Sequence, residues 1–390
     1  SLKNDVYPVN ALYNLYFAIT KSNKNANYSI SSADFRFNSV RTGQADGKRE
    51  IYVLVVGETS RAMEWSLYGY ERNTTPRMEG LDGLIHFTDV VTQSNNTHKS
   101  VPIILSAASA ENYGVIYDEK SIVTAFKEAG FRTLVIANQK LTTSMIGAFY
   151  READTFIDMS TFNTGSYLTS LHDAALLPYL EKELDKSDED MFIVLHTYGS
   201  HFKYLDRYTE SFSFFTPDQA IDASLSNRDQ LINAYDNTIR YTDFILHSII
   251  STLREQDCRA ALIYASDHGE DIFDDERHRF LHASPAPTYW QIHQASLVWL
   301  SPKLTQDNPE MAMALKDNSR KRISPQKSLF PTAMQLASIS SPLVVDSLSL
   351  VSSHYHPAPP VYLNDLNQPL PINSCGLKET DLKKLTPLLN

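Results

Sequence analysis

The chain has 390 residues, 42% of them hydrophobic, which is enough for one large α/β domain or two smaller ones. Its 35 basic and 46 acidic side chains give a net charge of −11, which argues against a nucleic-acid partner. Two cysteines, Cys258 and Cys375, are too few for a disulfide framework, so one pair and two free thiols are both open.

The first 48 residues are expected to be a linker. An apolar, helical-looking patch at 11–18 is followed by a polar stretch rich in Ser, Asn and Lys, which is typical of a connector leading into a domain. No apolar run approaches the ~18–20 residues that a membrane-crossing helix needs. Because the chain begins with Ser1 and shows no signal peptide, we expect that a targeting or anchoring segment has been removed.

From residue 49 onward, apolar strands alternate with helices. The β-branched run 51–56 is typical of a buried strand, and the amphipathic helix 121–129 closes at Gly130 directly before strand 132–137. The other expected elements are helices at 101–108, 169–184, 228–254 and 326–337 and strands at 191–197, 260–265 and 295–300. This alternation predicts an α/β domain over 49–345, with a mostly parallel sheet and helices on both faces.

The C-terminal residues 346–390 are rich in Pro and Asn. Such a composition favours an extended wrap or a loosely ordered end over further regular elements. We therefore expect a separate tail after the domain.

Three candidate metal ligands follow two of the strands. Glu58 comes after strand 51–56, and Asp267 and His268 come after strand 260–265. In an open α/β sheet the carboxyl ends of the strands form the edge where active sites lie. Two carboxylates and an imidazole suit zinc or manganese. The alternatives are a helix cap for Glu58, a turn cap for Asp267 and simple packing for His268.

Thr97 lies in the loop 92–102, which is crowded with hydroxyls and would begin a helix near Thr97. Free N–H groups at a helix start suit a phosphate, and a hydroxyl beside a metal can be deprotonated and act as a nucleophile. The alternative is an ordinary Ser/Thr cap. With the candidate ligands, this loop indicates a hydrolase or transferase acting on an ester of phosphate or sulfate.

Two further histidines follow strands at the same expected edge. His201 comes after strand 191–197, and His282 lies on the loop that follows His268. Each could bind a second metal ion or contact a phosphate. A solvated surface histidine is the alternative in each case.

Several short motifs occur in a fixed order between about residue 50 and about residue 340. They are VGETSR at 56–61, SLYGY at 66–70, RNTTP at 72–76, Thr97 before SVP at 100–102, HTYGSH at 196–201, SDHGE at 266–270 and LH at 281–282. Together they resemble the periplasmic catalytic domain of bacterial phosphoethanolamine transferases. That family includes the lipid A-modifying enzymes behind polymyxin resistance.

The resemblance implies an alkaline phosphatase/sulfatase-like fold and a site that holds one or two zinc ions rather than manganese. The residues carried over are the zinc ligands Glu58, Thr97, Asp267 and His268, the nucleophile Thr97, the second-zinc or phosphate residues His201 and His282, and Asn138, which resembles a substrate-pocket asparagine. Family members often carry a cysteine on each side of the nucleophile loop. Here Gln93 and Ile103 stand there, so packing and hydrogen bonds must hold the loop.

The resemblance also implies an activity. Phosphoethanolamine would pass from phosphatidylethanolamine to lipid A or a related lipid-linked glycan through a phospho-threonine. The enzyme would be a monomer, anchored in the bacterial inner membrane, with this domain in the periplasm. The alternatives within the fold are a phosphoglycerol transferase, a metal-dependent phosphodiesterase and a sulfatase. The sulfatase would need a Cys/Ser-x-Pro-x-Arg motif, which the loop 95–102 lacks.

Overall fold

The computed structural model describes residues 9–43, 47–139, 144–162 and 171–385, and these fold around one seven-stranded sheet in the order β3-β10-β7-β2-β6-β4-β5. The strands are β2 (Glu50–Gly57), β3 (Leu84–His86), β4 (Arg132–Ala137), β5 (Thr155–Asp158), β6 (Met191–His196), β7 (Arg259–Ser266) and β10 (Ser296–Leu300). Only β10 runs antiparallel to its neighbours, β3 and β7. The prediction of a mostly parallel sheet is therefore confirmed.

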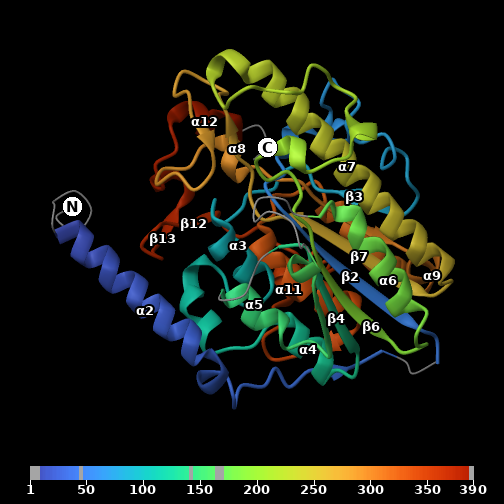
Figure 1. Ribbon diagram of the computed structural model, residues 1–390. Coiled ribbons are helices and arrows are strands. Elements are labelled where there is room, and N and C mark those ends of the chain that lie inside the picture. The colour runs from blue at the N-terminus through green and yellow to red at the C-terminus, as the bar shows by residue number, and fades with distance from the viewer. Residues whose placement is uncertain (1–8, 44–46, 140–143, 163–170, 386–390) are drawn as a thin grey trace.

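Strand β2 lies at the centre of the sheet and is buried along its whole length. Because successive side chains of a strand point to opposite faces, Tyr52, Leu54 and Val56 enter one core while the residues between them enter the other. Helices α3 (Thr97–Ile104), α4 (Ile122–Glu128), α5 (Met145–Tyr150) and α11 (Pro325–Leu336) contribute to the first core, and α6 (Leu177–Leu184) and α7 (Arg228–Glu255) to the second (Figure 1). Helices thus cover both faces, as expected.

Two expected helices have different bounds in the structure. The helix expected at 101–108 is α3, which starts four residues earlier because the Asn96 side chain accepts a hydrogen bond from the His98 N–H and caps it there. The helix expected at 169–184 begins as a 3₁₀ turn at Asp173–Leu176 and becomes α-helical only in α6. The start of that expected helix, 169–170, lies outside the described residues.

The N-terminal segment is more helical than its composition predicted. Helix α2 (Val9–Ser31) continues through the polar stretch and projects from the body of the molecule (Figure 1). Tyr28 and Phe37 are 6% and 1% exposed and belong to the first core. Part of this segment therefore packs on the domain, while its extent as a linker over 1–48 stays a prediction. Among the described residues, no helix is long and apolar enough to span a membrane.

As far as residue 385, the C-terminal segment packs on the domain and contains regular elements, which corrects the expectation of a loosely ordered end and of an extended wrap without such elements. Strand β12 (Val361–Leu363) pairs antiparallel with β13 (Pro369–Pro371), and α12 (Glu379–Leu385) follows. Leu350, Tyr362 and Leu363 are at most 1% exposed, since they pack on the domain. The boundary at residue 346 stays a prediction.

The remaining strands and α-helices of the described residues are short, and 3₁₀ turns such as Ala110–Tyr117 lie between the elements. The short strands and α-helices are β1 (Val40–Arg41) paired with β11 (Ile339–Ser340), β8 (Asp271–Ile272) paired with β9 (Phe280–Leu281), α8 (Tyr289–Ile292), α9 (Pro302–Asp307) and α10 (Pro309–Asn318). Cys258 and Cys375 are both buried and free.

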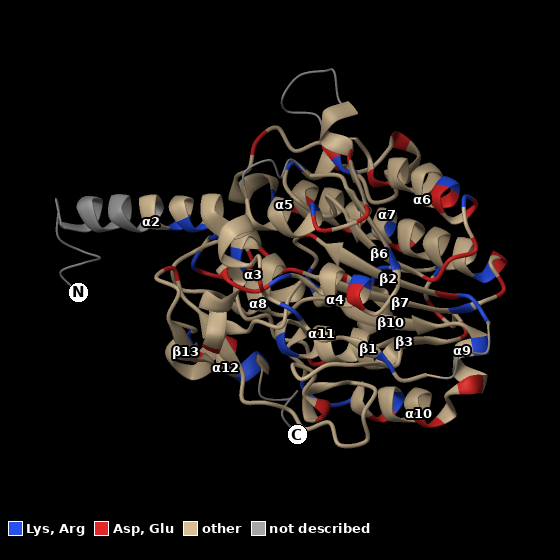
Figure 2. Ribbon diagram, turned by 90° about the horizontal axis from the view of Figure 1, so that it is seen from below, with Lys and Arg blue, Asp and Glu red and all other residues tan. Residues whose placement is uncertain are grey.

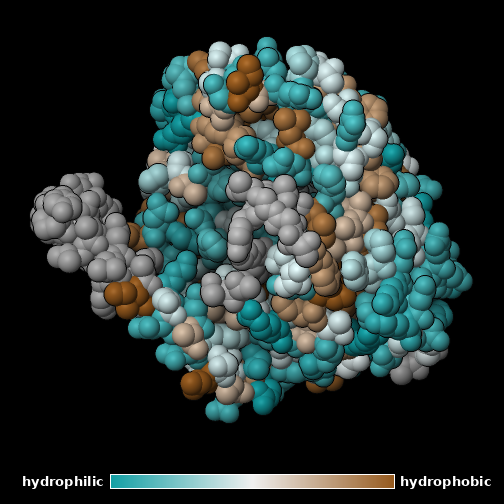
Figure 3. All heavy atoms as spheres, viewed as in Figure 1, coloured by the Kyte–Doolittle hydropathy of each residue, from teal (hydrophilic) through white to brown (hydrophobic). Residues whose placement is uncertain are grey.

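Charges of both signs are interspersed over α6, α9 and α10 (Figure 2), and the face seen in Figure 3 is mostly hydrophilic.

Candidate metal centre

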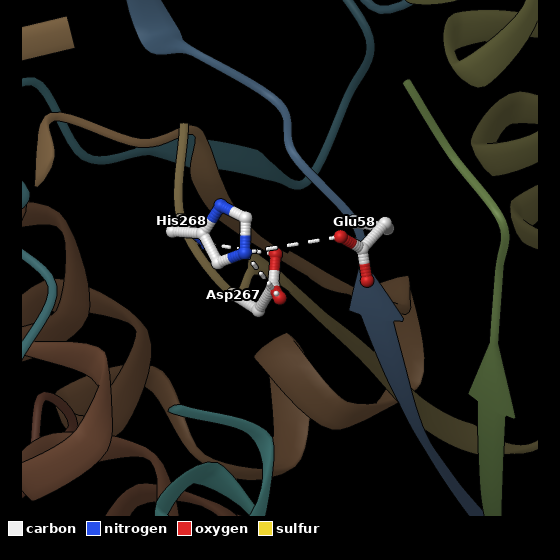
Figure 4. A group of neighbouring side chains, drawn as sticks. All are labelled: Glu58, Asp267 and His268. Carbon is white, nitrogen blue, oxygen red and sulfur yellow. Dashed lines mark hydrogen bonds and ion pairs between the residues drawn. The ribbon is translucent and has the colours of Figure 1, made fainter. Parts of the chain in front are cut away.

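Three of the predicted ligands emerge together at the carboxyl edge of the sheet. The register of β2 and β7 pairs Gly57 with Ser266, so the next residues, Glu58 and Asp267, leave the sheet side by side. His268 follows, and one ligand atom of each of the three lies within 4.8 Å of the others (Figure 4). Nε2 of His268 is 3.2 Å from Oδ2 of Asp267 and 3.8 Å from Oε1 of Glu58.

Thr97 joins this group from the first residue of α3. Its Oγ1 lies 3.2 Å from Oε1 of Glu58 and 3.1 Å from Nε2 of His268. Asn96 is the helix cap, so the alternative of Thr97 as the cap is wrong. The hydroxyl of Thr97 is thereby left to face the candidate ligands.

The donor set fits a divalent ion. Oδ1 of Asp267 accepts the N–H groups of Thr59 and His268 at 3.0 and 2.8 Å, whereas its buried Oδ2 has no hydrogen-bond partner among the described residues. A buried, unpaired carboxylate oxygen is costly unless something binds it. Nδ1 of His268 lies 2.8 Å from the Gly269 carbonyl, which fixes the proton there and leaves the Nε2 lone pair for a metal.

The electrostatics also favour a cation. Burial raises the pKa of Asp267 well above its usual value, and the charge of Glu58 raises it further. Burial acts in the same sense on Glu58, but His268, His201 and His282 outweigh it and lower the pKa of Glu58 to about 2. Burial, with a further contribution from His282, lowers the pKa of His268 to about 3. A bound cation would relieve the repulsion between the two carboxylates.

His282 and His201 line the same site. The ring centre of His282 is 4.3 Å from that of His268 and 5.8 Å from that of His201. Nδ1 of His282 lies 3.3 Å from Oε2 of Glu270, and Nδ1 of His201 lies 2.6 Å from the Phe202 carbonyl. With Nδ1 held in this way, each ring keeps Nε2 for a ligand.

Burial lowers the pKa of His282, but the hydrogen bond and charge of Glu270 outweigh burial and raise this pKa to about 9. The side chain of His282 is only 18% exposed. The alternative of a solvated surface residue therefore does not hold for His282.

The Asn138 side chain is hydrogen-bonded to residues other than the candidate metal ligands. It is 2% exposed, and its Nδ2 donates to Oδ1 of Asp173 at 2.8 Å and to the Leu171 carbonyl at 2.7 Å. A substrate role for Asn138 stays a prediction. Its neighbour Gln139 is the residue that reaches the site, because its Nε2 donates to Oε2 of Glu58 at 3.0 Å.

Sequence reasoning also missed the residues that lock these loops together. The Thr59 hydroxyl donates to Oε1 of Glu58 at 2.7 Å, and the Ser200 N–H donates to the Glu58 carbonyl at 3.0 Å. Gly199 has φ +55°, and a Cβ there would lie 2.6 Å from the Glu58 carbonyl oxygen. The loop that carries His201 is thus pressed against Glu58. The glycine between His196 and His201 was the available signal.

Gln93 and Ile103 hold the loop that carries Thr97 as expected, without a disulfide. Oε1 of Gln93 accepts the Ala110 N–H at 2.9 Å, and the Gln93 N–H donates to Oε1 of Gln326 at 3.1 Å. Ile103 is fully buried in the first core.

The parallel sheet and the buried acid and histidine ligands at its carboxyl edge are the architecture of an alkaline phosphatase/sulfatase-like enzyme. The sequence profile described as Sulfatase matches residues 50–339, so this chain belongs to the sulfatase family. Within that family it is homologous to the bacterial phosphoethanolamine transferases.

Two relatives and one further structure give the extent of the likeness. The chain is 29% identical over 307 residues to phosphoethanolamine transferase EptA of Escherichia coli K12, which covers 76% of this chain and 55% of that protein. It is 29% identical to the soluble domain of lipooligosaccharide phosphoethanolamine transferase A from Neisseria meningitidis, with a TM-score of 0.74 over 82% of this chain and 97% of that one. The periplasmic domain of E. coli EptC, solved as a zinc complex, shares the fold at 24% identity, with a TM-score of 0.78 over 88% and 97%. The chain spans about half the length of the full-length relatives.

Proposed function

We propose that this chain transfers phosphoethanolamine from phosphatidylethanolamine to lipid A or a related lipid-linked glycan through a phosphorylated Thr97. The observation that carries the proposal is the position of the Thr97 hydroxyl, which lies within 3.2 Å of both Glu58 and His268 at a helix start. Homology to phosphoethanolamine transferases supports the choice of group and donor.

Glu58, Thr97, Asp267 and His268 would hold a zinc ion, which lowers the pKa of a neighbouring hydroxyl and offsets charge on phosphoryl oxygens. The zinc complex of the EptC periplasmic domain supports the choice of metal. His201 and His282 would bind the transferred phosphate or a second zinc ion. Thr97, Glu58 and His268 come from separate loops that meet at the sheet edge, so the folded protein would orient the ester before any bond breaks.

The reaction has two balanced steps. Oγ1 of Thr97 forms a bond to phosphorus, the bond from phosphorus to the glycerol oxygen breaks, and diacylglycerol leaves with the proton. A hydroxyl or protonated phosphate oxygen of the acceptor then forms a bond to phosphorus, the bond from phosphorus to Oγ1 of Thr97 breaks, and Oγ1 takes the proton that the acceptor loses. Both half-reactions therefore require the same side chain.

The proposal places the enzyme at the bacterial inner membrane, with this domain in the periplasm. The relatives described as periplasmic domains and as an integral membrane protein support that location. Addition of a cationic ethanolamine to lipid A would reduce its negative charge, which is the basis for proposing polymyxin resistance as the phenotype.

The test is diacylglycerol release from phosphatidylethanolamine in detergent with zinc, together with an intact mass of the protein. Wild type should release diacylglycerol and gain a phosphoethanolamine adduct, and Thr97→Ala should do neither. Ser100→Ala is the matched control, because Ser100 is buried one turn further along α3 and its hydroxyl donates to the Asn96 carbonyl. Release that persists in Thr97→Ala would exclude Thr97 as the nucleophile.

The same assay separates the alternatives within the fold. Phosphatidylglycerol in place of the donor tests a phosphoglycerol transferase, a phosphodiester without a lipid tests a phosphodiesterase, and an aryl sulfate tests a sulfatase. Turnover of one of these, with none of phosphatidylethanolamine, would overturn the proposed donor.

A further inference from the structure

Four consecutive residues of the C-terminal segment, 362–365, contact the chain around Thr97. The Tyr362 hydroxyl donates to Oδ1 of Asn95 at 2.6 Å, and the Leu363 N–H donates to the Gln93 carbonyl at 2.7 Å. Tyr362 and Leu363 are at most 1% exposed. Both contacts lie before Thr97 in the loop.

The third contact lies beyond Thr97. Nζ of Lys99 donates to the Asn364 carbonyl at 2.6 Å and forms an ion pair of 3.5 Å with Asp365. Lys99 is only 6% exposed, so its ammonium depends on these partners. The C-terminal segment thus holds the chain on both sides of Thr97. Figure 1 shows β12 and β13 beside α3.

Asn95 also contacts the loop that follows His282. Its carbonyl accepts the Ala283 N–H at 3.0 Å, and its Nδ2 donates to the Ser284 carbonyl at 2.9 Å. These residues directly follow His282. Because Tyr362 binds Oδ1 of Asn95, it fixes which end of the amide faces the His282 loop.

We propose that residues 362–365 form a brace that positions Thr97 relative to His282. The inference rests on the proposed function, since it takes Thr97 as the nucleophile. The brace lies beyond residues 50–339, the part that matches the sulfatase family. It acts on a loop that no disulfide closes, because the chain's two cysteines lie elsewhere and are free. Tyr362 is a positioning residue, as it touches Asn95 and not the metal ligands.

The test compares Tyr362→Phe with Tyr355→Phe in the intact chain. Tyr355 is the matched control, since it is a buried tyrosine of the same C-terminal segment whose hydroxyl donates to the Arg322 carbonyl at 2.7 Å and not to a residue of the loop 92–102. Each variant loses one buried hydroxyl contact and keeps its ring. The readouts are kcat and KM for diacylglycerol release, zinc affinity, and hydrogen exchange of the amides at 93–99.

We expect Tyr362→Phe to lower kcat roughly tenfold at unchanged KM, to weaken zinc binding and to speed exchange at 93–99. Tyr355→Phe should leave kcat, zinc affinity and exchange at 93–99 at wild-type values, although it should lose about as much thermal stability as Tyr362→Phe. Lys99→Met, which removes the bond to Asn364, should give the same selective pattern if Tyr362→Phe does not fold. Equal effects of the 362 and 355 variants would overturn the brace.

Hydrogen exchange at 93–99 and zinc affinity test the brace even if the protein shows no transferase activity. A wild type that turns over no donor would overturn the proposed function alone. The brace would then stand if exchange at 93–99 rises only in Tyr362→Phe, and it would fail if exchange there is the same in both tyrosine variants.

Discussion

The Thr97 hydroxyl lies 3.1 Å from Nε2 of His268, although 171 positions separate the two residues in the chain. Thr97 is placed by the Asn96 cap of α3, and His268 by the end of β7. Two independent elements therefore aim a hydroxyl and an imidazole at one point. A divalent ion bound there would connect them through shared coordination.

Zinc should stabilise the fold. Ligand that binds only the folded state raises the free energy of unfolding by RT ln(1 + [L]/Kd), which is about 2.7 kcal/mol at a hundredfold excess over Kd. Zinc added to chelator-treated protein should therefore raise the melting temperature, measured by differential scanning fluorimetry. Magnesium, which prefers an all-oxygen octahedral shell, is the control and should raise it far less. An unchanged melting temperature with zinc would contradict a metal centre.

Asp267→Asn should make the metal-free protein more stable by about 1 kcal/mol. Asparagine cannot ionise, so the change removes the cost of protonating a carboxyl whose pKa burial and Glu58 raise, while Oδ1 of the amide can still accept the N–H groups of Thr59 and His268. The variant should also lose the stabilisation by zinc. Urea unfolding with and without zinc measures both effects.

Asp274→Asn is the control for that change. Asp274 is paired with buried Arg61 at 2.8 Å, so its neutralisation should destabilise the protein by about 1–3 kcal/mol. If the metal-free Asp267→Asn variant is also less stable than wild type, the pKa of Asp267 is not raised in the folded protein.

Gly199→Ala should destabilise the protein and weaken zinc binding together. Both Gly199 and Gly80 have a positive φ, but a Cβ at 199 would lie 2.6 Å from the Glu58 carbonyl oxygen, whereas one at 80 meets nothing within 4 Å. Gly80→Ala should therefore cost only the backbone strain of about 1 kcal/mol, and Gly199→Ala clearly more. Chemical denaturation and zinc titration of both variants provide the measurement. Equal costs, with zinc affinity intact, would argue against the contact between this loop and Glu58.

Ionisation of Asp236 should lower the free energy of unfolding as the pH rises. Burial, with a further contribution from Glu64, raises the pKa of Asp236 to about 7, even though Arg72 contacts its Oδ2 at 2.9 Å. Since the unfolded value is about 3.9, the folded state binds more protons between pH 4 and 7, and this group reduces stability by up to about 1.4 kcal/mol per pH unit across that window.

Asp236→Asn should remove that slope. The stability of the variant relative to wild type should rise from pH 4 to pH 7 and stay constant above about pH 8. Urea unfolding at pH 5, 6, 7 and 8 measures the difference. Parallel curves for the two proteins would mean that Asp236 titrates normally in the folded state.

Local sequence pattern predicted much of the fold. The continuous apolar run that became β2 predicted a strand buried on both faces, and the structure shows it at the centre of the sheet. The short strands β3 and β5 gave too few residues for a pattern, and the polar half of α2 lacks an apolar stripe. For β3 and β5, long-range pairing with β10 and β4, and not local preference, decided the structure.

For the site, the sequence by itself predicted the candidate residues. Glu58, Asp267 and His268 were candidates because they follow strands and Thr97 because it lies near a helix start, and both signals are local, while the family resemblance supplied the roles proposed for them. Only the tertiary structure decided which neighbours hold them. The contacts from Gln139 to Glu58 and from Tyr362 to Asn95 join residues 81 and 267 positions apart. Such contacts depend on how the loops dock at the sheet edge, and no local pattern encodes that docking.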